Sequence, residues 1–214
     1  MSLKCFIGFD PRQPVAFQVC AHSVWEHASR RVEIVRLDLR TLPIKRRGLT
    51  EFTYSRFLVP WLSYFDGQSL FLDSDMLVRG DICELDVPPA GAVSIVRSKL
   101  KFEWASVMRF DNAKLKHMTP EFIDDPANRL YDWTWADDQM GRLNPEWNHL
   151  VGYDDPNPDA KIVHFTKGIP VWPETKDCEF AAEWWACCNR SNSSVSYDAL
   201  MGPSVHNEKR LVAR

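Results

Sequence analysis

The stretch that decides the fold is SLFLDSD, residues 69–75. Its first four residues are almost wholly apolar and predict a short buried strand. Asp73 and Asp75 follow directly, and in extended backbone two residues that are two apart point to the same side. Converging carboxylates repel each other unless a positive charge lies between them. A hard cation with oxygen ligands, Mn²⁺ or Mg²⁺, satisfies such a pair.

The same tripeptide is also compatible with a turn that its own side chains cap. Its position favours the cation site, because apolar residues flank it on both sides, at 70–72 and 76–78. A buried strand seldom leads into two unpaired charges. In open α/β sheets ligands bind outside the carboxyl ends of the strands, and a metal there can bridge the phosphates of a nucleotide.

The first forty residues predict a strand–helix–strand unit. Residues 5–9 form an apolar run that ends at Asp10-Pro11, and residues 32–39 alternate as a second strand. Between them, Pro14 opens a helix whose apolar residues recur at helical spacing to residue 28. The order predicts parallel strands and an α/β fold.

Further elements are predicted along the chain. A helix is expected over 53–64, with Pro60 kinking or restarting it. Another short helix is expected over 137–143, and a helix rich in aromatic residues over 177–188. The remaining predicted strands are 69–72, 92–96, 107–110 and 161–165. We assign 1–190 to one domain and 191–214 to a polar C-terminal tail.

Composition narrows the class of protein. The chain has 214 residues, of which 45% are hydrophobic and 26% charged, as expected for one globular domain. The net charge of −3 argues against a nucleic-acid partner. The sequence has no apolar run long enough for a transmembrane helix and no signal-peptide pattern, which predicts a cytoplasmic protein. The six cysteines have no zinc spacing and are expected to be thiols.

Residues 51–81 resemble the core of family 8 glycosyltransferases. They contain an aromatic-x-Arg segment, the apolar strand, Asp-x-Asp and then RGDI at 79–82. Three further blocks match in order: IGFD at 7–10, DDQ at 137–139 with WN at 147–148, and IVHF at 162–165 with KG at 167–168. The resemblance implies the GT-A fold, a Rossmann-like mixed sheet flanked by helices in a single domain.

The resemblance also implies a metal site. Asp73, Asp75 and His164 would hold the ion, and a histidine ligand favours Mn²⁺ over Mg²⁺. A histidine at a strand end is otherwise expected to be hydrogen-bonded in place.

The same family implies residues for the donor. Asp10 would reach the nucleotide base, and Ser74 would lie on the nucleotide. Arg56 would lie near the diphosphate, although a solvated charge is the ordinary alternative. Lys167 and the Gly168 backbone would hold the pyrophosphate, since glycine permits close approach.

Two residues would act on the sugar: Asp138 would bind its hydroxyls, and Gln139 would lie beside the anomeric carbon. One loop departs from the family, which usually has Asn-Ser-Gly before its Val-Met strand where this chain has WAS at 104–106. Because that loop helps to hold the sugar, the donor's identity stays open.

The predicted activity is transfer of a sugar, from a UDP-sugar donor, to a hydroxyl acceptor with retention of configuration. The acceptor could be a glycan, a lipid-linked molecule or another hydroxyl compound. No residue stands out as a carboxylate nucleophile, so we favour front-face attack in which the leaving phosphate accepts the proton.

Two alternatives remain: an inactive nucleotide- or sugar-binding relic, and a nucleotidyltransferase, although residues 8–12 are not the Gly-rich loop expected of the latter. Basic residues at 40–47 and 209–214 leave peripheral membrane contact open.

Overall fold

The computed structural model describes residues 2–88, 90–136 and 140–191. Its strands are β1 (Leu3–Phe9), β2 (Val32–Asp38), β3 (Gln68–Leu72), β4 (Met76–Val78), β5 (Val93–Ile95), β6 (Val107–Asp111), β7 (Met140–Arg142), β8 (His149–Leu150) and β9 (Ile162–His164). Its α-helices are α1 (Pro14–His27), α2 (Val59–Leu62), α3 (Pro120–Asp124) and α4 (Ala181–Ser191). Its 3₁₀ turns are η1 (Leu39–Thr41), η2 (Ser55–Leu58), η3 (Ile82–Leu85), η4 (Lys101–Ala105), η5 (Asn112–Lys114), η6 (Leu130–Asp132), η7 (Thr134–Ala136) and η8 (Pro145–Trp147).

The main sheet is mixed, in the order β2-β1-β3-β6-β5-β7. Strand β1 pairs in parallel with both β2 and β3, as the strand–helix–strand prediction required. Strand β6 then runs antiparallel to β3 and to β5. The carboxyl ends of β1, β3 and β5 therefore lie at the same edge of the sheet, which is where ligands bind in open α/β sheets.

A small second sheet, β4-β9-β8, begins where β3 ends. Residues 73–75 form a bend between β3 and β4, so the acidic tripeptide is the passage from one sheet to the other. Strand β9 pairs antiparallel with β4 and places His164 opposite Met76. This pairing brings residue 164 next to residue 75, although the two are far apart in the sequence.

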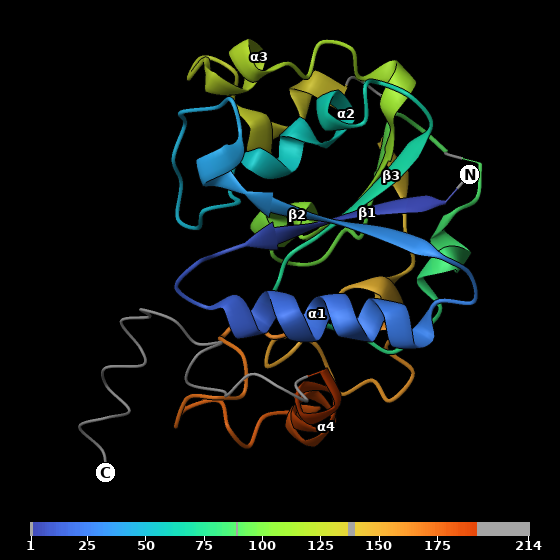
Figure 1. Cartoon of the computed structure of the whole chain (residues 1–214), viewed down its shortest axis with the longest axis vertical. Helices are drawn as coiled ribbons and strands as arrows, with labels where there is room; N and C mark the ends of the chain where they lie inside the picture. The colour runs from blue at the N-terminus through green and yellow to red at the C-terminus, as the bar shows by residue number, and fades with distance from the viewer. Residues whose placement is uncertain (1, 89, 137–139, 192–214) are drawn as a thin grey trace.

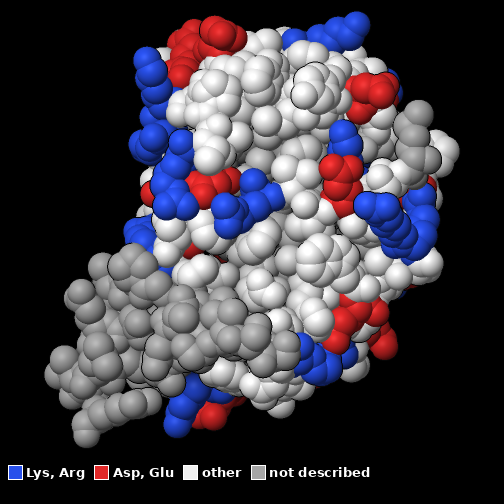
Figure 2. Space-filling view, in the orientation of Figure 1, with Lys and Arg blue, Asp and Glu red and all other residues white. Residues whose placement is uncertain are grey.

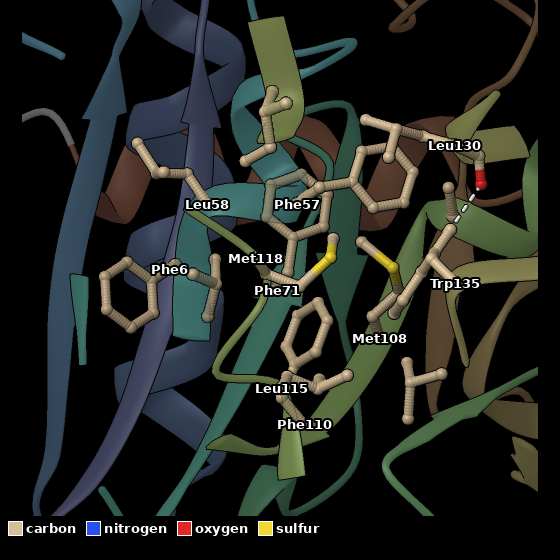
Figure 3. Packing of buried hydrophobic residues seen from close by; sticks show 14 of the residues in the cluster. Phe6, Phe57, Leu58, Phe71, Met108, Phe110, Leu115, Met118, Leu130 and Trp135 are labelled. Atoms are coloured by element: carbon tan, nitrogen blue, oxygen red, sulfur yellow. Dashed lines mark hydrogen bonds between the residues drawn. The ribbon is translucent and has the colours of Figure 1, made fainter. Parts of the chain in front are cut away.

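Helices cover both faces of the main sheet (Figure 1). On one face, Phe6, Phe71 and Met108 pack against the segment that contains η2 and α2. Figure 3 shows this packing, with Phe57 among the sheet residues and the Trp135 indole donating to the Leu130 carbonyl at 2.7 Å. Each such fully buried large side chain contributes about 1.5–3 kcal/mol of transfer free energy.

Helix α1 covers the other face, where its residues Cys20 and Val24 pack on β1 and β3. Helix α4 then packs on the far side of α1 (Figure 1). Trp184 and Cys187 are fully buried at this contact. The adjacent cysteines at 187–188 are thus explained by helix packing, and all six cysteines are free thiols.

Several predicted elements need correction. The helix expected over 53–64 covers only 55–62 and consists of the 3₁₀ turn η2 and the short α2, which has Pro60 in its first turn, as the expected restart required. Pro60 has no N–H to donate to the carbonyl four residues earlier, so one regular helix cannot run through it. The helix expected over 177–188 begins at Ala181 and ends at Ser191.

The helix expected over 137–143 is also wrong in its described part. Residues 140–142 form strand β7, which pairs in parallel with β5. Residues 137–139 lie outside the described residues, and so do 192–214, which contain almost all of the expected polar tail.

The face in Figure 2 carries both signs of charge, interspersed among uncharged residues. Among the described residues, no helix has the length and apolar character needed to cross a bilayer.

Candidate active site

Three side chains predicted as metal ligands meet at the passage between the sheets. Asp73, Asp75 and His164 each offer one ligand atom, and these atoms lie within 4.8 Å of one another. Asp73 and His164 are buried, whereas the Asp75 side chain is 31% exposed. The carboxylates converge from a bend rather than from the extended backbone that the sequence argument assumed.

Main-chain contacts fix both aspartates. The N–H of Asp73 donates to the Ser106 carbonyl at 3.0 Å, and the carbonyl of Asp75 accepts from the N–H of Phe165 at 2.9 Å. The first contact ties the aspartate pair to the loop before β6. The second ties it to the residue after His164, so the geometry is set by two neighbouring chain segments.

Arg56 is the counter-charge of Asp73. Its Nη2 lies 2.9 Å from Asp73 Oδ1, and the guanidinium is only 1% exposed. The same group donates to the carbonyls of Phe52 at 3.1 Å and Ala105 at 2.9 Å, and it lies 5.0 Å from the Phe71 ring centroid. Arg56 therefore lies buried beside Asp73. Its expected proximity to a diphosphate remains a prediction.

Two residues of this site were missed as candidates by the sequence analysis. Asn148 Oδ1 lies 3.1 Å from His164 Nδ1, and Asn148 Nδ2 donates to the Glu103 carbonyl at 3.1 Å. Glu103 Oε2 accepts a 2.8 Å hydrogen bond from the Ser106 hydroxyl and lies 3.8 Å from His164 Nδ1. Asn148 was visible as part of the Trp-Asn block, but no local signal brings Glu103 from η4 to this histidine.

Burial and charge shift the titration of the cluster. Burial raises the pKa of Asp73, with Arg56 opposing this effect and Asp75 adding to it. Burial alone would lower the pKa of His164, but the carboxylates of Asp75, Asp73 and Glu103 outweigh it and raise the pKa to about 9. Without a metal the imidazole is thus a cation held among carboxylates.

The unsatisfied oxygens fit a cation. Asp73 Oδ1 and Asp75 Oδ1 are buried, yet neither accepts a well-formed hydrogen bond from the described residues. Arg56 and His164 approach them at 2.9 and 3.4 Å without hydrogen-bond alignment. Two carboxylates and an imidazole are a donor set suited to Mn²⁺. Such orphaned oxygens are costly unless a ligand completes them.

The residues predicted to hold the pyrophosphate lie just after β9. Gly168 has φ +110°, which favours glycine, and an added Cβ would come within 3.1 Å of the Trp172 ring. Its N–H donates to the Phe165 carbonyl at 2.7 Å. Lys167 is exposed, donates to the Gly152 carbonyl at 3.0 Å and lies over the Tyr153 ring. The Lys167 side chain therefore lies outside the acidic cluster in this structure.

The remaining predicted residues are more scattered. Asp10 follows β1 and forms a bidentate ion pair with Arg12, with Nε 2.9 Å from Oδ1 and Nη2 2.6 Å from Oδ2. Ser74 is buried between the two aspartates. Asp138 and Gln139, predicted to act on the sugar, lie outside the described residues.

The chain is similar in sequence to a plant protein. No family model matches it. It is 34% identical to Protein CDI of Arabidopsis thaliana, over 85% of this chain and 84% of that protein.

Among solved structures, it is similar to the apo bifunctional glycosyltransferase WbbM, with TM-score 0.69, 16% identity and coverage of 87% of this chain and 49% of that one. The chain thus spans about half the length of WbbM. It also resembles the galactosyltransferase LgtC in complex with donor and acceptor sugar analogs, with TM-score 0.64, 12% identity and coverage of 92% and 98%.

The glycosyltransferase GlyE of Streptococcus pneumoniae is a third similar structure, with TM-score 0.63, 17% identity and coverage of 100% of this chain and 65% of that one. At these identities the three structures establish the fold. The sequence relative, in contrast, covers most of both chains. The chain therefore belongs to the family of the Arabidopsis Protein CDI, and it has the GT-A fold seen in glycosyltransferases.

Proposed function

We propose that this protein is a glycosyltransferase that moves a sugar from a UDP-sugar to a hydroxyl acceptor. One observation carries the proposal: Asp73, Asp75 and His164 converge within 4.8 Å at the ligand-binding edge of a GT-A fold. The similar LgtC structure was solved with donor and acceptor sugar analogs, which supports the same class of substrates here.

The three converging residues would hold Mn²⁺ or Mg²⁺. When bound, the ion would neutralise the diphosphate of the donor and stabilise the charge of the leaving group. Arg56, 2.9 Å from Asp73, would orient that carboxylate and favour its ionised form against the opposing effect of burial. The Gly168 backbone lets a phosphate approach closely, and the flexible Lys167 side chain would reach it after leaving the Gly152 carbonyl.

The reaction is proposed to retain configuration by front-face attack. The acceptor hydroxyl would attack the anomeric carbon while the bond to the leaving phosphate breaks, and a phosphate oxygen would take the hydroxyl proton. Asp138 would orient the sugar hydroxyls and Gln139 would lie beside the reacting carbon. Asp10 would contact the nucleotide base and Ser74 the nucleotide.

The test compares the wild-type protein with Asp75→Ala. Release of UDP is measured with a panel of UDP-sugars, in the presence of Mn²⁺ and then of a chelator. We expect turnover that requires the metal in the wild type and none in the variant. Asp177→Ala is the matched control, because the Asp177 side chain is 86% exposed and its ion pair with Lys176 is a 3.7 Å surface contact.

Full activity of Asp75→Ala would contradict the proposed metal site. Binding of UDP and Mn²⁺ without turnover of any sugar donor would instead identify the chain as an inactive relic of the fold. Release of pyrophosphate from a nucleoside triphosphate would identify a nucleotidyltransferase. The acceptor class and the cytoplasmic location remain predictions from the sequence.

A further inference from the structure

Asn148 occupies an unusual place beside the candidate metal site. It lies between η8 and β8 and is only 1% exposed. Its carboxamide bridges two groups that approach from opposite sides. Nδ2 lies 3.1 Å from the Glu103 carbonyl oxygen, and Oδ1 lies 3.1 Å from His164 Nδ1. Both ends of this buried amide are thus engaged.

Chemistry fixes which way the amide faces. The Glu103 carbonyl can only accept a hydrogen bond, so the NH₂ group of Asn148 must face it. The amide oxygen then faces His164, and this oxygen also can only accept. The proton must therefore be on His164 Nδ1. In the metal-free cation Nε2 also carries a proton; when this proton leaves and the ion takes its place, the imidazole keeps its proton on Nδ1 and has its lone pair on Nε2.

The lone pair has a defined direction. His164 Nε2 lies on the side of Asp75, 3.4 Å from its Oδ1. A second acceptor near His164 Nδ1 is Glu103 Oε2, but it is 3.8 Å away and accepts from the Ser106 hydroxyl. Asn148 is therefore the residue whose hydrogen bond selects the tautomer. Metal-bound histidines commonly receive this kind of support at their second nitrogen.

We propose that Asn148 is a positioning residue that holds His164 in the tautomer whose Nε2 lone pair faces the Asp73–Asp75 pair, with the Glu103 main chain fixing the amide's orientation. This inference rests on the proposed function, because it assigns a role toward the metal that the function requires. It concerns a residue that touches neither the substrate nor the ion.

The test is a Mn²⁺ titration, with free Mn²⁺ followed by electron paramagnetic resonance. Asn148→Leu keeps a similar side-chain shape and removes both hydrogen bonds. We expect it to weaken Mn²⁺ binding about 10–100-fold, as is typical when such a supporting partner is lost. Asn148→Asp keeps an oxygen that accepts from Nδ1–H but loses the donor to the Glu103 carbonyl, so it should recover only part of the affinity. Asn144→Leu, on the exposed residue four positions earlier, should bind like the wild type.

An Asn148→Leu protein that binds Mn²⁺ like the wild type would overturn the inference and leave the proposed function standing. A wild-type protein that binds no Mn²⁺ would overturn both. A second measurement needs no variant: ¹⁵N NMR of His164 in the Mg²⁺-loaded wild type. We expect a proton on Nδ1 and none on Nε2, and the opposite tautomer would refute the role of Asn148 even if the variants fail to fold.

Discussion

Two groups of charged residues in this molecule have similar chemistry and different settings. One is the buried cluster, in which Arg56 meets Asp73 at 2.9 Å beside Asp75 and His164. The other joins the surface of α4 to α1, where Arg190 donates to both carboxylate oxygens of Glu26 at 2.5 and 2.7 Å. In the first group buried oxygens lack hydrogen bonds. In the second, both oxygens accept well-formed bonds.

The unsatisfied oxygens of the buried cluster are typical of a ligand site, whereas the satisfied Arg190–Glu26 pair helps to pack α4 on α1. Removing buried charges from water is costly, and the mutual attraction of the pair repays this only when every group is satisfied. The surface pair avoids most of this cost, but solvent screens its attraction. We therefore expect changes in the buried cluster to have large effects on stability and metal binding, and changes at the surface to have small ones.

The largest expected effect is that of Arg56→Met. It leaves Asp73 as a buried charge without its partner, which should lower the free energy of unfolding by about 3–5 kcal/mol. Urea unfolding measures the change. The control is Arg190→Met, which removes the surface arginine and should leave the unfolding curve almost unchanged. Equal losses of unfolding free energy in the two variants would contradict the expected difference between the buried cluster and the surface pair.

Metal addition should stabilise the wild type. Because an ion that binds only the folded state shifts the equilibrium, Mn²⁺ at 100 times its dissociation constant should add about 2.7 kcal/mol. Thermal unfolding with Mn²⁺ and then with a chelator tests this expectation. Asp75→Ala should show no such increase, and a similar increase in that variant would place the ion elsewhere.

A smaller effect is expected for Glu103→Gln. The glutamine keeps an oxygen that can accept from the Ser106 hydroxyl and removes one negative charge near His164. In the metal-free protein the pKa of His164 should therefore fall below its value of about 9. NMR titration of the imidazole measures it, and an unchanged pKa would show that Glu103 does not act on this ring.

The smallest effect is expected at the surface pair. Arg190 is the main cause of the low pKa of Glu26, which is about 2 instead of 4.5. A carboxyl whose pKa is depressed on folding stabilises the protein above about pH 4.5 and loses that contribution as the pH falls toward 2. Urea unfolding of the wild type and Glu26→Gln should thus differ slightly at pH 6, and the difference should narrow at pH 3 and disappear below about pH 2. A gap that widens at pH 3 would contradict this.

The sequence predicted the parts of the fold that depend on local pattern. The strands at 5–9 and 69–72 and the helix from Pro14 follow from apolar spacing and were confirmed. The helix expected at 53–64 restarts around Pro60, as predicted, but its first half is the 3₁₀ turn η2 and not an α-helix. Strand β7 was missed, because it has three residues and exists only through its pairing with β5.

The candidate site, too, could be predicted only in the part that depends on local sequence pattern. Asp73 and Asp75, which are two residues apart, could be predicted to converge, and the family resemblance added His164. The burial of Arg56 and the approach of Glu103 could not be predicted, since both depend on how η2 and η4 pack beneath the bend. These contacts are long-range, and no spacing within either segment encodes them.

The attachment of the aspartates to the loop before β6 has an evolutionary consequence. Asp73 is held by the carbonyl of Ser106, and Arg56 by the carbonyl of Ala105. Every amino acid supplies a carbonyl, so these two anchors do not depend on which side chains stand at 105 and 106. The side chains themselves are fully buried, and the Ser106 hydroxyl also donates to Glu103. The loop where this chain departs from the family 8 pattern therefore holds the acidic pair through main-chain atoms, which a changed sequence keeps wherever the backbone path is preserved.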